Sequence, residues 1–117
     1  MVNNWQKIKL QDAATVTGDG NIIFIGNNSH LTIVVSGTST SFSVSFKCAL
    51  SKNVPSDQWV PLEGIRRDSM SYTSTASVMS TGYEVEVSKW AYFKAQITAI
   101  DNGNVTVTCN PVIDPNS

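Results

Sequence analysis

The chain has 117 residues, which is the size of one ordinary domain and is long enough to bury a core without a metal or a disulfide. Its formal net charge is −1, and 15% of its residues are charged, against roughly 25% in most soluble domains. This balance excludes the basic patch that nucleic-acid binding requires and argues against insertion into, or attraction to, an anionic membrane. The chain instead has 15 serines and 11 threonines, whose hydroxyl groups would keep outward strand positions hydrated without charge.

The N-terminal sequence MVNNWQKIKL lacks the apolar core of a signal peptide. No apolar run approaches the roughly 18 residues that span a bilayer. We therefore expect the chain to fold in a cytoplasm, where Cys48 and Cys109 would stay reduced.

Alternation of apolar and polar residues recurs along the chain and is broken by Gly, Asn, Asp and Ser at short intervals, which is typical of strands. The predicted strands cover residues 5–10, 13–17, 21–26, 31–36, 41–49, 57–62, 82–88, 92–100 and 104–109. The pattern predicts a single all-β domain over 1–117, an antiparallel β-sandwich of eight or nine short strands with a jelly-roll or immunoglobulin-like topology.

Three strands have a clear inward face because successive side chains point to opposite sides of a strand. The predicted inward sets are Phe42, Val44, Phe46 and Cys48; Tyr83, Val85 and Val87; and Phe93, Ala95, Ile97 and Ala99. Glu84, Glu86 and Lys94 are expected to point outward.

These faces suggest registers for two hairpins. A three-residue loop at 89–91 would place Val87 opposite Phe93 and Glu86 opposite Lys94. In the sequence ITAIDNGNVTVTC, the dipeptide NG is a strong signal for a two-residue turn, but that register mixes the two faces. A three-residue loop at 101–103 instead pairs Ala99 with Val105 and Ala95 with Cys109, and it requires a left-handed backbone at Gly103.

The segment 63–81 shows weak alternation and holds the only adjacent arginines, Arg66 and Arg67. A connection of this length is often functional. We expect an irregular, exposed crossover, with a short strand around 71–78 as the alternative.

Catalytic and metal-binding motifs are missing from the sequence. His30 is the only histidine and falls in a predicted turn, where a solvent-facing role is expected. Glu84 and Glu86 share a strand face at a spacing that loosely resembles the carboxylate pair of a glycosidase. This face is expected to be polar and solvated, so neither carboxyl would have the raised pKa that a general acid needs. We expect no catalytic residue, no metal and no cofactor, and hence no enzymatic activity.

The tryptophans are the main candidates for contacts. Trp90 is predicted at a loop tip beside Tyr92, where an exposed aromatic pair can stack on a sugar or anchor a protein partner. The alternative is packing of Trp90 against a neighbouring loop or the N-terminal strand. Trp59 is expected in the core, and Trp5 either caps the sandwich or meets a neighbouring subunit. Candidate ligand or partner contacts are thus Trp90, Tyr92, Arg66, Arg67 and Trp5.

Cys48, Trp59 and Cys109 invite an immunoglobulin interpretation. No tyrosine stands two residues before Cys109 and only eight residues follow it, so a true immunoglobulin domain is not expected. A buried, reduced thiol is the preferred state of each cysteine, with an approach between them left open.

Several motifs carry a resemblance over roughly residues 20–108: GNIIFIG, LTIVVSGTS, FSVSFKCAL, QWVPLEG and GYEVEVSKWAYFKAQITAIDNGNVTVT. Together they resemble small β-sandwich structural proteins of tailed bacteriophages, which serve as head-decoration, head-fibre or tail-appendage components. The segment 63–81 matches nothing in that pattern, and Lys94 stands where arginine is common.

The resemblance implies a non-enzymatic virion structural or accessory protein that folds in the bacterial host cytoplasm and docks on capsid or tail. It also implies a homo-oligomer, in which Trp5, Val16 or the run 22–25 would be partly interfacial. The alternative function is a carbohydrate-binding or host-receptor-binding module that contacts a cell-surface glycan through Trp90, Tyr92 and the segment 63–81.

Overall fold

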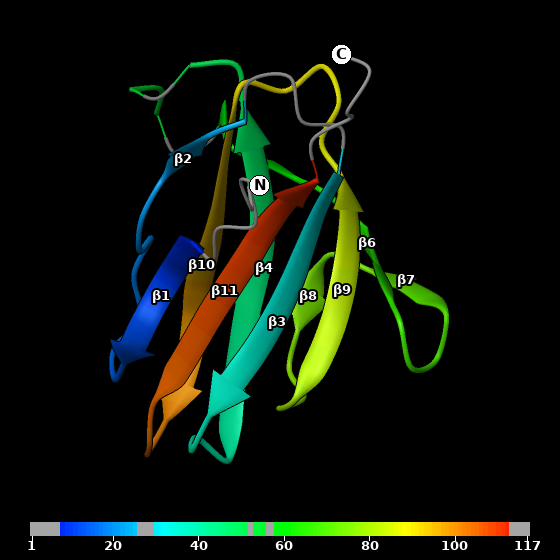
Figure 1. The fold of residues 1–117 in the computed structure, drawn as a ribbon. Coiled ribbons are helices and arrows are strands. Elements are labelled where there is room, and N and C mark those ends of the chain that lie inside the picture. Colours follow the sequence, from blue (N-terminus) through cyan, green and yellow to red (C-terminus); the bar gives the residue numbers. More distant parts are fainter. Residues whose placement is uncertain (1–7, 26–29, 52, 56–57, 113–117) are drawn as a thin grey trace, which may run out of the picture.

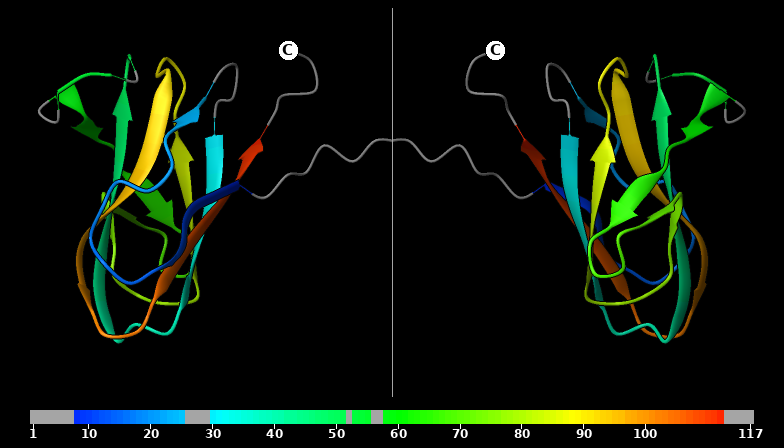
Figure 2. Two further views of the ribbon diagram at one scale, coloured as in Figure 1. Left: turned by 90° about the vertical axis from the view of Figure 1, so that its left-hand side faces the viewer. Right: turned by 90° about the vertical axis from the view of Figure 1, so that its right-hand side faces the viewer.

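A computed structural model describes residues 8–25, 30–51, 53–55 and 58–112, which form two antiparallel sheets packed face to face (Figures 1 and 2). The six-stranded sheet has the order β1 (Ile8–Ala14), β11 (Val105–Val112), β3 (His30–Gly37), β9 (Thr81–Glu86), β6 (Gly64–Arg66), β7 (Ser71–Thr73). The five-stranded sheet has the order β2 (Ile23–Phe24), β10 (Tyr92–Asp101), β4 (Ser41–Ala49), β5 (Val60–Pro61), and β8 (Thr75–Ala76) also pairs with β4. The all-β sandwich is confirmed, with eleven strands in the described residues instead of eight or nine.

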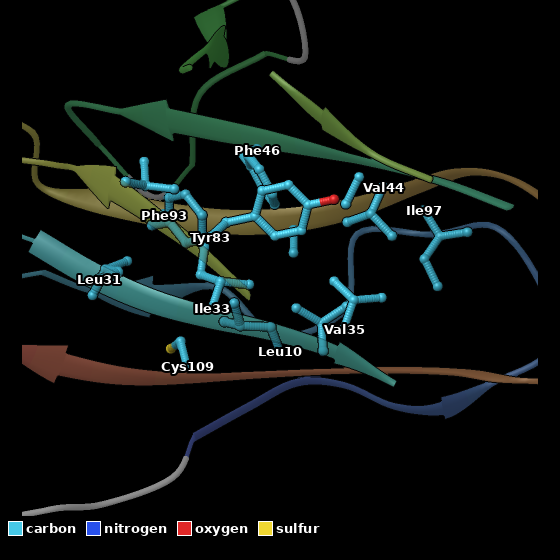
Figure 3. Packing of buried hydrophobic residues seen from close by; sticks show 14 of the residues in the cluster. Leu10, Leu31, Ile33, Val35, Val44, Phe46, Tyr83, Phe93, Ile97 and Cys109 are labelled. Carbon is cyan, nitrogen blue, oxygen red and sulfur yellow. The ribbon is translucent and has the colours of Figure 1, made fainter. Parts of the chain in front are cut away.

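The core lies between the sheets and is built from the inward faces that the alternation predicts. Phe46 meets Tyr83 edge to face at 5.3 Å between ring centroids and stacks on Phe93 at 6.3 Å, so aromatic rings from both sheets meet in the core (Figure 3). Ala99 is the exception to the predicted faces, because a bulge between Ile97 and Ala99 turns it outward and lets Ile100 pack on the core.

The predicted hairpin between 82–88 and 92–100 is wrong. β9 pairs with β3 and β6, whereas β10 pairs with β4 and β2 in the other sheet. Val87 and Phe93 are both buried, as expected, but on opposite sides of the core. Glu86 therefore lies opposite His30, and Lys94 lies opposite Lys47. Alternation identifies the inward face of a strand but not its sheet.

The connection 101–104 also crosses between the sheets, so the predicted pairing of Ala99 with Val105 is wrong. Val105 pairs with Gly37 and Ala99 with Ser43. The left-handed backbone predicted at Gly103 is confirmed, with a φ of 68°. Asn102 also has a positive φ, 47°. Two consecutive left-handed residues are typical of the two-residue turn that NG first suggests, here used to change sheets.

The segment 63–81 is not an irregular crossover. β6 and β7 form a short hairpin at the edge of the six-stranded sheet, and β8 then adds to β4 in the five-stranded sheet (Figure 1). The alternative of a short strand within 71–78 is confirmed. The strands predicted at 5–10 and 13–17 are one strand, β1, which ends at Ala14. Of the predicted strands 21–26 and 57–62, only β2 and β5 form; residues 5–7, 26 and 57 lie outside the described residues.

Chain segment 15–22 runs beside the open edge of β10 and closes one side of the sandwich. The backbone groups of Gly18 and Ile97 exchange two hydrogen bonds of 3.1 and 2.8 Å. The buried side-chain amide of Gln11, on β1, donates to the carbonyl oxygens of Gly18 at 3.1 Å and Ala95 at 2.8 Å. Gln11 thereby ties the two sheets together and fixes the position of Asp19 on the outside of β10.

Candidate binding face

The outer face of the five-stranded sheet carries a buried lysine, Lys94, and an exposed aromatic ring, that of Phe24. Direct partners in an antiparallel pair point to the same side, and Phe93 and Cys48 point to the core. The alternate residues therefore point away from it. This outer face consists of Phe24, Tyr92, Lys94, Gln96, Lys47, Ser45 and Thr75, with Trp59 lying over it.

Lys94 has the predicted outward parity but is not exposed, because two distant segments cover it. Only 4% of its side chain is accessible. Its ammonium lies 3.1 Å from a carboxylate oxygen of Asp19 and 4.4 Å from the centroid of the Trp59 ring. A buried ammonium needs such partners, since desolvation of an unpaired charge is costly.

Asp19 also accepts a 3.0 Å hydrogen bond from the side-chain amide of Gln96. One half-exposed carboxylate thus joins two outer-face residues of β10 to the segment 15–22. Trp59 is buried, as predicted, but lies outside the main core cluster, since its ring packs over Lys94.

Tyr92 has an aromatic partner on this face, although it is not the predicted one. The rings of Phe24 and Tyr92 lie 5.4 Å apart at 59°, and Phe24 is 67% exposed. Trp90 is not an exposed loop-tip residue: it is partly buried and packs against the core cluster, a contact that neither sequence-based interpretation named. The sequence places Phe24 only within the run 22–25, which is expected to be partly interfacial, and does not single it out as a partner of Tyr92; within that run Phe24 is exposed and Ile25 is buried.

Arg66 and Arg67 lie on the other sheet, at the end of β6, and both face carboxylates. The guanidinium of Arg66 donates two hydrogen bonds to Asp68, at 2.6 and 3.0 Å, which lowers the pKa of Asp68 and raises that of Arg66. Arg67 lies 3.7 Å from Glu84. The structure thus separates the arginines from Tyr92. Trp5 lies outside the described residues.

The cysteines lie on opposite sheets, Cys48 on β4 and Cys109 on β11, and both are free thiols. Burial raises the pKa of Cys48 to about 12 and that of Cys109 to about 11, so neither is a thiolate near neutral pH. The predicted buried, reduced state is what the structure contains.

The described residues contain no group of three or more His, Cys, Asp or Glu side chains that could hold a metal ion. His30 opens β3 instead of lying in a turn, and its Nε2 is 3.9 Å from a carboxylate oxygen of Glu86. Within the described part of the chain, no helix is long and apolar enough to cross a membrane.

Comparison with known proteins identifies the family. The family model of XepA matches residues 4–110. The chain belongs to the XepA family. Among curated proteins no sequence match is found.

Two solved structures share the fold of this chain. The SPBc2 prophage-derived protein YomS superposes with a TM-score of 0.84 at 18% identity, over 97% of this chain and 96% of YomS. The PBSX exported protein XepA superposes with a TM-score of 0.81 at 18% identity, over 95% of this chain. This chain spans 39% of the XepA structure. Both neighbours carry phage names, SPBc2 prophage for YomS and PBSX for XepA, which agrees with the phage resemblance seen in the sequence.

Proposed function

We propose that the chain is a non-enzymatic structural or accessory protein of a phage particle, which docks on capsid or tail as a homo-oligomer. Membership of the XepA family carries the proposal, because the related YomS is prophage-derived and matches this chain end to end. The thiols are buried and protonated, and the arginines are neutralised by carboxylates. These are features of a scaffold that acts by binding.

An add-back experiment tests docking. Particles of a phage lacking this gene are mixed with purified chain and sedimented through a sucrose gradient, with particles of an unrelated phage as the control. We expect the chain to sediment with its own particles at a fixed ratio and not with the unrelated ones. A chain that stays at the top of both gradients contradicts docking.

A second candidate is a host-surface module that binds a cell-wall or cell-surface glycan. Two observations favour it: the aromatic pair of the exposed Phe24 and the partly exposed Tyr92, and the description of the structural neighbour XepA as an exported protein. Exposed aromatic rings bind the apolar faces of sugars. Glycan arrays test this function, and no binding by any glycan at millimolar concentration would contradict it.

A further inference from the structure

The strongest unexplained feature of the molecule is a pair of lysines on the outer face of the five-stranded sheet. Lys94 and Lys47 are direct cross-strand partners, which places their Cβ atoms roughly 4.5–5.5 Å apart, and like charges in such positions repel each other. Asp19 neutralises the buried Lys94. Lys47 is half-buried and forms no ion pair with any described residue. Asp19 therefore balances Lys94 alone, and an anion beside Lys47 would balance the second ammonium.

The aromatic rings of Tyr92 and Phe24 lie next to the Lys94–Lys47 pair along the strands. Tyr92 precedes Lys94 by two positions on the same face of β10, which corresponds to about 7 Å along the strand. The neighbouring ring of Phe24 is largely exposed. A flat apolar surface next to an ammonium suits a ligand that has both an apolar face and a negative charge.

Polar groups lie one step further along the same strands. Gln96 is paired with Ser45, and Ser45 with Thr75, so these residues form a row across β10, β4 and β8. The amide of Gln96 donates to Asp19 and its oxygen is buried, so the hydroxyls of Ser45 and Thr75 are the groups of this row that match ligand hydroxyls. Aromatic rings, a cation and hydroxyl-binding groups thus follow one another over about 14 Å of strand.

We propose that this face binds an acidic glycan: Phe24 and Tyr92 stack on a sugar ring, Lys47 pairs with a carboxylate or phosphate of the glycan, and Ser45 and Thr75 bond its hydroxyls. Lys94 positions the site by holding Asp19 and Trp59 in place. The inference rests on the second proposed function and specifies its substrate class. An acidic protein segment would supply the charge but not the polyhydroxylated ring that this order of groups fits.

Calorimetry with four probes tests the inference: a galacturonate oligomer, its neutral methyl ester, a sugar phosphate, and a glutamate peptide. We expect the galacturonate oligomer or the sugar phosphate to bind, with affinity that falls as salt is added. The variants Lys47→Gln and Phe24→Ala should each weaken binding about tenfold or more, as expected for a lost charged contact or aromatic platform.

The other sheet supplies matched controls, Lys9→Gln for charge and Tyr72→Ala for an exposed aromatic, and both should leave binding within about twofold of wild type. Equal binding of the methyl ester would overturn the acidic requirement while leaving the glycan function standing. Equal binding of the glutamate peptide would overturn the glycan requirement. If no probe and no arrayed glycan binds, both this inference and the second proposed function fail.

Discussion

At the scale of single residues, Gln11 is the most informative polar group. The residue is 6% exposed, and its side-chain amide donates to the carbonyls of Gly18 and Ala95, although Gln11 and Ala95 lie in different sheets. The Gly18 carbonyl also accepts from the N–H of Ile97, so the Ala95 carbonyl depends more on Gln11. A buried polar group that loses its partner costs the full desolvation energy.

We therefore predict that Gln11→Ala lowers the free energy of unfolding by about 1–3 kcal/mol. Urea denaturation followed by tryptophan fluorescence measures this change. The control is Gln58→Ala, because Gln58 is exposed and should change stability by less than about 0.5 kcal/mol. Equal effects of the two substitutions would show that Gln11 does not tie the sheets together.

The two thiols predict a dependence of stability on alkaline pH. Burial raises the pKa of Cys48 to about 12 and that of Cys109 to about 11, whereas an unfolded cysteine titrates near 8.5. Below about pH 8.5 both states keep the protons and the stabilisation is complete. As the pH rises towards 11, only the unfolded state releases protons, so the free energy of unfolding falls by up to about 1.4 kcal/mol per pH unit for each thiol.

Urea denaturation between pH 8 and 10 under reducing conditions tests this dependence. Lysines and tyrosines titrate at overlapping pH, so the comparison is with the double variant Cys48→Ala, Cys109→Ala. The wild type should lose stability more steeply with pH than the variant, whatever their absolute stabilities. Identical slopes would contradict the burial of protonated thiols.

At the scale of elements, period-two alternation predicted which residues of β4, β9 and β10 face the core, but not how the strands pair. A buried Val87 and a buried Phe93 satisfy the alternation equally well as neighbours in one sheet and as partners across the core. In the structure these two residues lie on opposite sides of the core, because β9 and β11 belong to the six-stranded sheet and β10 belongs to the five-stranded sheet. Choosing between these arrangements depends on long-range packing, such as that of Tyr83 on Phe46, which local patterns do not contain.

The turn at 101–104 is the element whose backbone is most constrained by its sequence. A Cβ at Gly103 would lie 2.6 Å from the backbone nitrogen of Ser39, and the φ of 68° is unfavourable for other residues. We predict that Gly103→Ala destabilises the protein by about 1–3 kcal/mol in thermal or urea unfolding.

Gly82→Ala is the matched control for this turn. Gly82 lies within β9, and the nearest atom to an added Cβ is the Ile33 carbonyl oxygen at 3.9 Å. It should be neutral to within about 0.5 kcal/mol. A Gly103→Ala variant as stable as the Gly82→Ala variant would mean that the turn adopts another conformation in solution.

The candidate site shows the same division between local and long-range information. Outward parity predicted where Tyr92 and Lys94 point, and the sequence marked Tyr92 as a contact residue. The partners came from elsewhere: Phe24 from β2, Trp59 from the segment before β5, and Asp19 from the segment beside β10. Short strands of two residues, such as β2 and β5, give almost no periodic signal, so this face could not be assembled from the sequence.

At the scale of the whole molecule, the protein is a two-sheet sandwich of the XepA family with an apolar core and one face that carries aromatic and cationic side chains. A serine- and threonine-rich surface with little net charge suits an assembly component, since it stays hydrated without strong repulsion between copies. The central claim is that this scaffold belongs to the phage particle.

Quantitative mass spectrometry of the phage that encodes this chain tests that claim most directly. Gradient-purified particles and the particle-free lysate are compared by peptides of this chain against those of the major capsid protein and a cytoplasmic host protein. The account predicts that the chain remains with the particles in a fixed ratio to capsid protein through repeated purification. Recovery of the chain only in the particle-free lysate would contradict it.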